Sequence, residues 1–473
     1  MAAASLQIRA PIAIATSPQS GRKTPGSRNR SNLQLHTSLL PSPPPPMPSP
    51  SLRLAVVGAG AAGLAAAREL RREGHAPVVF ERAAAVGGTW LYTPPATATA
   101  AADPLGAAAT HSSLYASLRT NLPREVMGFL DFPFVAAAAP HGSADPRRFP
   151  GHEEVLRYLE EFARRFDLHR LVRFETEVVS VRREHLGRWA VTSRKLGEKG
   201  SGEEEVYDAV VVCNGHYTEP RVAVIPGVVI IIGASASAFD ISRDVASVAK
   251  EVHIADRSLP ASTCEKQPGY DNLWLHSMID CAQDDGNVVF KDGSSIKSDV
   301  IMHCTGYHYD FPFLGDDSTI TVDDNRVDAL YKHIFPPEVA PQLSFIGLPW
   351  KVIPFPLFEL QSKWVAAVLS GRIKLPPKDE MIEDVKACYS ELEARGWPKR
   401  YTHNFSNCQF EYDDWLAEQC GHPPIEEWRK LMYAANAKNK KARPESYRDE
   451  WDDDYLVEEA NEDFKKYLYK VVS

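Results

Sequence analysis

Near the start of the chain, three glycines have the spacing G-x-G-x-x-G, which suits the binding of phosphate. They follow the apolar residues 54–57 and precede an alanine- and leucine-rich stretch at 61–72. In this pattern the first glycine permits a tight turn, the second lets a pyrophosphate approach the backbone, and the third lets a helix pack on a strand. A helix that starts here also presents unpaired N–H groups to the phosphates. The predicted cradle consists of Gly58, Ala59, Gly60, Ala61, Ala62 and Gly63.

A weaker form of the same pattern occurs in the middle of the chain, after the apolar residues 228–232. Ser235 and Ala238 stand where the first motif has its second and third glycines. A serine hydroxyl can still donate a hydrogen bond to phosphate, and alanine still allows a helix to pack closely. The predicted second cradle consists of Gly233, Ala234, Ser235, Ala236, Ser237 and Ala238. The chain is therefore predicted to bind two dinucleotides.

Each motif is followed by a second apolar strand that ends in an acidic residue, Glu81 in the first case and Asp256 in the second. Such an acid accepts hydrogen bonds from ribose hydroxyls. Arg257 follows Asp256, and its forked donors suit the 2′-phosphate of NADPH. Asp256 would suit the free 2′-hydroxyl of NADH instead, so NADPH is favoured and NADH stays open.

The elements that must position these residues alternate between strand and helix, which predicts an α/β fold. Each unit is closed by a further, almost wholly apolar strand that ends near a glycine, Gly215 in the first unit and Gly306 in the second. Continuous apolar strands are typical of parallel sheets. We therefore expect two Rossmann-like dinucleotide-binding domains, the second (228–305) inserted into the first (51–227 and 306–473).

The bulk composition narrows the classes of function. The chain has 473 residues, 44% of them hydrophobic, and a net charge of −9, so a nucleic-acid partner is not expected. No apolar run is long enough to span a membrane. Seven cysteines are scattered without any C-x-x-C pair, so we expect reduced thiols and neither a metal site nor a disulfide framework.

Residues 1–50 differ from the rest, with no Asp or Glu, many Ser and a proline-rich end. Such a segment cannot bury enough apolar surface to fold, so we expect a disordered leader. Its acid-free, Ser- and Arg-containing composition is typical of an organellar transit peptide, and an upstream extension before Met47 without a targeting role fits equally. Both the cytoplasm and the chloroplast therefore stay open as its location.

Several longer segments carry a family resemblance: "VVGAGAAGLAAAREL", "GGTW", "LRTNLPREVMGF", "FPGHEEVLRYL", "NGHYTEP", "IIIGASASAFDISRD", "HCTGY" and "FIGLPWKVIPFPLFELQSKW". In these the chain resembles plant flavin-containing monooxygenases, in particular the group similar to glucosinolate S-oxygenases. The resemblance implies FAD in the first domain and NADPH in the inserted one. It also implies that reduced FAD reacts with molecular oxygen to form a C4a-hydroperoxyflavin, which oxygenates a thioether sulfur or an amine nitrogen of a small molecule.

The resemblance also assigns roles to residues outside the glycine motifs. Gly88 and Trp90 in "GGTW" and Gln361 in "FELQSKW" would lie at the FAD. Thr120 and Asn121 in "LRTNLP" match a Thr/Ser–Asn pair whose amide lies beside the flavin and the nicotinamide, so Asn121 is the predicted catalytic residue. Trp90 as a core residue, and Asn121 as a turn residue ahead of a proline, are the alternatives.

One segment of the family pattern, F-x-G-x-x-x-H-x-x-x-Y/F, is missing between Gly215 and Gly233. Its loss predicts a looser orientation of the two domains, and misplacement by about 1 Å can cost on the order of a hundredfold in rate. An alternative is therefore a FAD-binding protein with impaired or no monooxygenase turnover. A disulfide reductase is excluded, because residues 85–212 contain no cysteine. The acidic run at 449–454 is predicted to be a solvated cap on a helical C-terminus.

Overall fold

The computed structural model describes residues 51–92, 114–136, 144–198, 200–216, 219–220, 230–315 and 320–468. All of them lie in the unit Ser49–Ser473. The predicted leader, residues 1–50, lies outside the described residues. Among the described helices, none combines the length and the apolar character that crossing a membrane requires.

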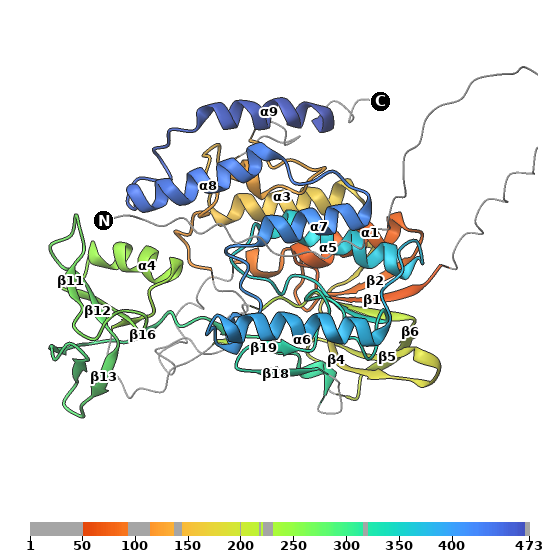
Figure 1. Cartoon of the computed structure of the whole chain (residues 1–473), viewed down its shortest axis with the longest axis horizontal. Helices are drawn as coiled ribbons and strands as arrows, with labels where there is room; N and C mark the ends of the chain where they lie inside the picture. Colours follow the sequence, from red (N-terminus) through yellow and green to blue (C-terminus); the bar gives the residue numbers. More distant parts are fainter. Residues whose placement is uncertain are drawn as a thin grey trace, which may run out of the picture. The chain divides into compact units, whose positions relative to one another are not determined.

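Around the first glycine motif, five parallel strands form a sheet in the order β20-β7-β1-β2-β3. The strands are β1 (Arg53–Val57), β2 (Ala76–Phe80), β3 (Val172–Arg173), β7 (Ala209–Val212) and β20 (Leu343–Phe345). β1 lies in the middle, and the glycine motif follows its carboxyl end. Helix α1 (Ala61–Arg72) has the predicted bounds and packs against α5 (Pro354–Leu369), as Figure 1 shows.

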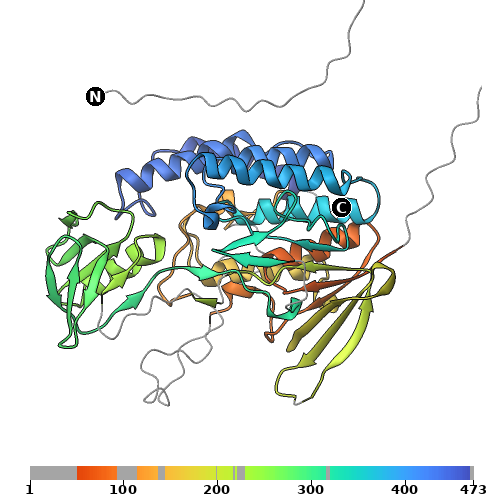
Figure 2. The ribbon, with the colours of Figure 1, turned by 60° about the horizontal axis from the view of Figure 1, so that its bottom comes forward.

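Around the second motif, five strands form a sheet in the order β11-β12-β10-β9-β16. The strands are β9 (Ile231–Ile232), β10 (Val252–Asp256), β11 (Cys264–Lys266), β12 (Leu273–Ser277) and β16 (Met302–His303). All pairs are parallel except β11 with β12. Helix α4 (Ala236–Ala246) follows β9 as α1 follows β1. The chain is therefore an α/β protein with two Rossmann-type units, as predicted, and Figure 2 shows the second unit in green.

Short antiparallel strands complete the two units. The two stretches of chain that connect the sheets pair with each other as β8 (Glu219–Pro220) and β17 (Tyr307–His308). The exact domain boundaries at 227/228 and 305/306 stay a prediction, since residues 221–229 lie outside the described ones. The remaining strands are β4 (Thr176–Arg183), β5 (Trp189–Lys195), β6 (Glu203–Tyr207), β13 (Ile279–Ala282), β14 (Asn287–Phe290), β15 (Ser295–Lys297), β18 (Thr321–Asp323) and β19 (Arg326–Asp328).

Helices from the whole length of the chain share one hydrophobic core with α1 and α5. Figure 1 shows α3, α7, α8 and α9 on the same side of the first sheet as these two helices. The remaining helices are α2 (Arg124–Met127), α3 (His152–Arg165), α6 (Lys378–Ala394), α7 (Gln409–Cys420), α8 (Glu427–Ala442) and α9 (Asp454–Leu468).

The acidic run at 449–454 is solvated in most of its length, as predicted, since Asp449, Glu450, Asp452 and Asp454 are exposed, and Asp453 is the exception. Asp453 is only 7% exposed and accepts two hydrogen bonds from Arg148, at 2.6 and 2.9 Å. Asp449 pairs with Arg119 at 2.9 Å. These carboxylates meet arginines from a distant part of the sequence, and the opposite charges tie the start of α9 to the segments around Arg119 and Arg148.

Candidate functional site

The two glycines that open the predicted cradles have nearly the same conformation and surroundings. Gly58 has a φ of +102° and Gly233 a φ of +108°, in the region that favours glycine. A Cβ atom on Gly58 would lie 2.5 Å from the carbonyl oxygen of Cys213, and one on Gly233 would lie 2.4 Å from that of Cys304. In each unit the glycine N–H donates to the end of the second strand, at 2.8 and 2.9 Å. The same turn is therefore built twice.

The second and third glycines of the first motif differ in what the protein itself requires of them. Gly60, the N-cap of α1, has φ −73° and ψ −174°, which any residue can adopt, and it has no side-chain cap. A Cβ atom there would meet only Gly88, at 3.4 Å. A Cβ atom on Gly63 would lie 1.9 Å from the carbonyl oxygen of Gly58. Gly63 is thus needed for packing, whereas the protein itself does not require a glycine at position 60, and the approach of a phosphate there stays a prediction.

Glu81 lies directly after β2 and is buried beside this cradle. Its two carboxylate oxygens accept hydrogen bonds from the N–H groups of Ala59 and Ala83, each at 2.7 Å. Burial raises the pKa of Glu81, and these two N–H groups counteract part of that rise. Each oxygen keeps a further lone pair that a ribose hydroxyl could use. Ala61 and Ala62 are buried in the first turn of α1, where backbone N–H groups have no partner within the helix.

The "GGTW" segment packs directly on the first cradle. Gly88 begins a single turn of 3-10 helix that ends at Trp90, and it lies against Gly60. The preceding Gly87 donates its N–H to the carbonyl oxygen of Ala59 at 3.1 Å. Trp90 is half-buried and packs against the core, which agrees with the alternative interpretation of Trp90 as a core residue. Its contact with FAD stays a prediction.

Thr120 and Asn121 lie in an extended segment that pairs with the start of α3. Thr120 donates its N–H to the carbonyl oxygen of Pro150 at 2.9 Å. Its side chain is buried, and the hydroxyl has no hydrogen-bond partner among the described residues, as expected of a group that meets a ligand. Asn121 is exposed, and its carbonyl oxygen accepts a hydrogen bond from Asn436 at 3.1 Å. Its amide side chain is therefore available, and its catalytic role stays a prediction.

The second cradle has exposed hydroxyls where the first has bare backbone. Ser235 is the N-cap of α4 and Ser237 lies in its first turn, and both are exposed without a side-chain hydrogen bond to a described residue. Ala238 is fully buried against the sheet, as the third glycine position requires. Ala234 and Ala236, on either side of Ser235, are half-buried.

The acid and the arginine that follow β10 have different surroundings. Asp256 Oδ1 accepts hydrogen bonds from the N–H and the hydroxyl of Ser258, both at 2.8 Å. Arg257 is exposed and forms no hydrogen bond or ion pair with the described residues. The carboxylate therefore stabilises its own turn, and the guanidinium is available to a ligand.

Two polar residues of α5 are fully buried, and both are held inside the protein. Gln361 accepts the N–H of Gly347 at 2.9 Å and donates to the hydroxyl of Tyr412 at 3.2 Å. Glu359 pairs with Arg68 of α1 at 3.1 Å. Both ends of the Gln361 amide are thus engaged, and its contact with FAD stays a prediction.

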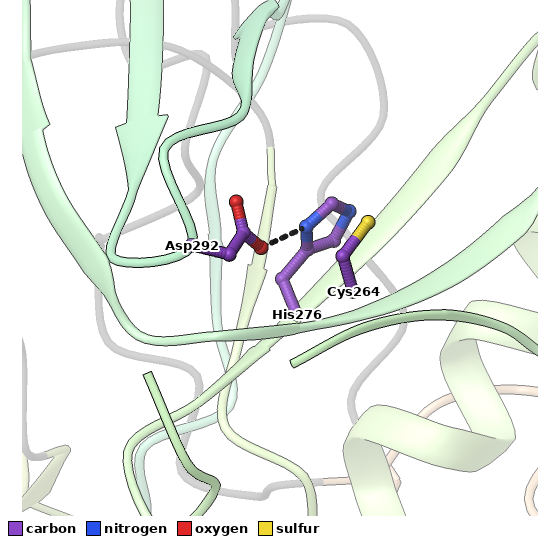
Figure 3. A group of neighbouring side chains, drawn as sticks. All are labelled: Cys264, His276 and Asp292. Carbon is purple, nitrogen blue, oxygen red and sulfur yellow. Dashed lines mark hydrogen bonds and ion pairs between the residues drawn. The ribbon is translucent and has the colours of Figure 1, made fainter. Parts of the chain in front are cut away.

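A cluster of potential metal ligands lies in the second unit (Figure 3). Cys264 and His276 are opposite each other on β11 and β12. His276 contacts Asp292 through Nδ1 and His253 through Nε2, both at 3.0 Å. Burial, and then the Asp292 carboxylate, raise the pKa of the Cys264 thiol. Since both ring nitrogens of His276 are already hydrogen-bonded within the protein, we interpret the cluster as a tie between neighbouring strands.

Sequence reasoning missed how α4 is held. Its side chains contact Tyr115, Ser117 and Arg448, which are 125, 127 and 208 residues away from their partners. A local motif carries no signal for contacts of such separation, and only co-variation between homologues could have indicated them.

The chain matches the family model described as flavin-binding monooxygenase-like over residues 51–228 and 275–426. Flavin-containing monooxygenase FMO GS-OX-like 2 of Arabidopsis thaliana is 56% identical over 442 residues, which cover 86% of this chain and 93% of that protein. Flavin-containing monooxygenase FMO GS-OX5 of the same species is 53% identical over 431 residues, which cover 85% and 92%. The family model thus spans the first cradle and leaves out the residues of the second.

Among solved structures, the chain is similar to S-allyl-L-cysteine S-oxygenase from Allium sativum. That similarity has 59% identity and a TM-score of 0.83, and covers 89% of this chain and 100% of that one. Tmm from a Pelagibacter strain has 24% identity and a TM-score of 0.69 over 84% of this chain and 93% of that one, and this likeness concerns the fold alone.

Proposed function

The chain belongs to the flavin-binding monooxygenase-like family, as an FAD-dependent monooxygenase of the plant GS-OX-like group, and on this premise we propose that it uses NADPH and molecular oxygen to oxygenate a small thioether. Sulfur is favoured because the chain is 59% identical to an S-oxygenase that acts on S-allyl-L-cysteine. An amine nitrogen is the second soft nucleophile that the same chemistry would accept. The observation that carries the proposal is the repeated glycine turn at Gly58 and Gly233, since transfer of electrons between two dinucleotides requires two such sites.

Bound FAD, once reduced, would supply the activation of oxygen, so the protein has to bind and orient the cofactors and the substrate and to exclude water. We infer that the space at Gly60 and the start of α1 hold the FAD pyrophosphate, with Glu81 at the ribose. The unpaired hydroxyl of Thr120 supports a ligand at the neighbouring segment, where the Asn121 amide would contact the flavin.

The preference for NADPH rests on Arg257, whose guanidinium is free, whereas Asp256 stabilises its own turn. Hydrogen bonds to a charged group contribute about 1.5–3 kcal/mol, so Arg257→Ala should raise KM for NADPH by about 10- to 100-fold. KM for NADH should stay within about twofold, because NADH lacks the 2′-phosphate. Lys250→Ala is the matched control, since this exposed cation lies beyond the other end of β10. Equal effects of Arg257→Ala on both cofactors would contradict the assignment.

The function is tested with FAD-loaded full-length protein and S-allyl-L-cysteine. NADPH oxidation should accelerate when the thioether is added, and about one sulfoxide should form per NADPH consumed. The alternative, a flavoprotein without turnover, predicts bound FAD and no acceleration. Hydrogen peroxide as the sole product, with or without the thioether, would refute oxygenation of sulfur.

A further inference from the structure

Helix α4 of the second unit is held by side chains from two other parts of the chain. Arg448 donates to both carboxylate oxygens of Asp240, at 2.6 and 3.3 Å, and the hydroxyl of Tyr115 donates to the same carboxylate at 3.3 Å. One turn further on, Ser117 donates to Asp244 at 2.7 Å. We refer to Tyr115, Ser117, Asp240, Asp244 and Arg448 as the α4 clasp.

Arg448 also holds the segment that contains the predicted catalytic amide. Its Nε donates to the carbonyl oxygen of Thr120 at 3.0 Å, while its two other nitrogens hold Asp240. The Arg448 and Asp240 side chains are only 16% and 18% exposed, so solvent and salt screen this ion pair weakly. One planar guanidinium thus joins α4 to the backbone next to Asn121.

We propose that Arg448 is a positioning residue that fixes the second dinucleotide-binding unit relative to Thr120 and Asn121. The inference rests on the proposed function, in which these two parts of the protein face the two cofactors. Because Ser235 caps the same helix that carries Asp240, a shift of Asp240 moves the second cradle with it. The clasp thereby supplies the fixed orientation that the missing family segment was expected to remove.

The geometry also explains why the residue is an arginine. Arg448 donates to acceptors on two different segments, and the rigid guanidinium sets the distance between them. A lysine at this position would carry the same charge but only one nitrogen, which could not hold both acceptors in the same geometry. Arg448→Lys should therefore resemble Arg448→Gln more than the wild type.

The first readout is the rate constant for flavin bleaching after anaerobic mixing of the FAD-loaded full chain with NADPH. In Arg448→Gln and in Asp240→Asn it should fall about tenfold or more, because small misplacements of reacting groups are costly. The double variant should be no slower than Arg448→Gln alone, since Arg448→Gln already removes the contact between Arg448 and Asp240. Arg443→Gln is the matched control: it pairs with Asp452 at 2.5 Å on the same C-terminal segment, and its rate should stay within about twofold.

The second readout is independent of turnover. Hydrogen exchange of the FAD-loaded protein without NADPH should quicken in α4 and in residues 114–121 of Arg448→Gln, and not in Arg443→Gln. Unchanged exchange there, or a bleaching rate within about twofold of the wild type, overturns the inference. Should Arg448→Gln lose FAD, Asp240→Asn decides alone, since it leaves the contact with Thr120 in place. If NADPH does not reduce the FAD of the wild type, the proposed function fails. The hydrogen-exchange measurement then still tests whether Arg448 holds α4 and residues 114–121.

Discussion

Two alanine substitutions in the first glycine motif should separate cofactor binding from folding. At Gly60 a methyl group has room within the protein, because its only neighbour would be Gly88 at 3.4 Å. At Gly63 the same methyl group would lie 1.9 Å from the carbonyl oxygen of Gly58, well inside van der Waals contact. Gly60→Ala therefore places its methyl group where the FAD pyrophosphate is proposed to lie, whereas Gly63→Ala forces α1 away from the strand end.

The expected magnitudes follow from these distances. Overpacking of this kind costs about 1–3 kcal/mol, and each kcal/mol lowers Tm by about 2–4 °C in domains of 150–250 residues, so Gly63→Ala should lower Tm by several degrees. Gly60→Ala should lower Tm of the FAD-free protein by no more than about 2–4 °C, since an alanine N-cap costs only about 1 kcal/mol. Its Kd for FAD should rise at least about tenfold, the equivalent of 1.4 kcal/mol, because the pyrophosphate can no longer approach the backbone.

The assay is thermal unfolding of the FAD-free proteins, followed by titration with FAD monitored by flavin fluorescence. Comparing both variants in both measurements makes the result diagnostic, since a general loss of stability would affect Tm and affinity together. If Gly60→Ala bound FAD with wild-type affinity, the cradle would not lie at this glycine. If Gly60→Ala unfolded like Gly63→Ala, the distinction drawn from the two Cβ positions would be wrong.

Two further predictions concern stability. The Arg68 side chain is 2% exposed among Glu359, Glu69 and Asp131, so Arg68→Met should lower the free energy of chemical unfolding by about 3–5 kcal/mol. The neighbouring Arg72 is 43% exposed, and Arg72→Met should lower it by about 1 kcal/mol or less. Similar losses in both variants would contradict the role of burial. The hydrogen bond from Arg173 lowers the pKa of Glu205 to about 2. Because this pKa is below its ordinary value, the stabilisation is present above about pH 4.5 and is lost as pH falls towards about 2, and Glu205→Gln should narrow the difference in Tm between about pH 6 and pH 3. If the difference in Tm between the two pH values were the same in Glu205→Gln and the wild type, the stabilisation assigned to Glu205 would be refuted.

The first unit could be predicted closely from the sequence because its signals are local. The glycine spacing, the apolar run before it and the alanine-rich stretch after it predicted a helix at 61–72, which are the bounds of α1. The position of Glu81 beside the cradle followed from its place at the end of β2. Such features depend on contacts within one strand–helix–strand unit, where residue type and spacing determine the backbone.

The features that were missed or misjudged depend on distant partners. The burial of Asp453 within the otherwise exposed acidic run was missed because its partner, Arg148, lies 305 residues earlier, and Arg119, the partner of Asp449, lies 330 residues before it. The hydrogen bonds of Gln361 were likewise missed, since nothing in its own helix indicated that Gly347 and Tyr412 engage both ends of its amide, and its predicted contact with FAD stays a prediction. Charge and polarity in the sequence show that a side chain needs a partner, and only the fold decides which partner it has.

Distant contacts also matter for the missing family segment between Gly215 and Gly233. The expectation of a loose domain orientation assumed that contacts close to the connecting chain set that orientation. Among the described residues of the two connecting stretches, β8 and β17 pair over two residues each, and one short pair of strands can act as a hinge. The α4 clasp is a second attachment at a different place on the unit, and two separate attachments restrict a rotation that one alone permits. A shortened link is therefore compatible with transfer between the two dinucleotides, provided that the clasp holds.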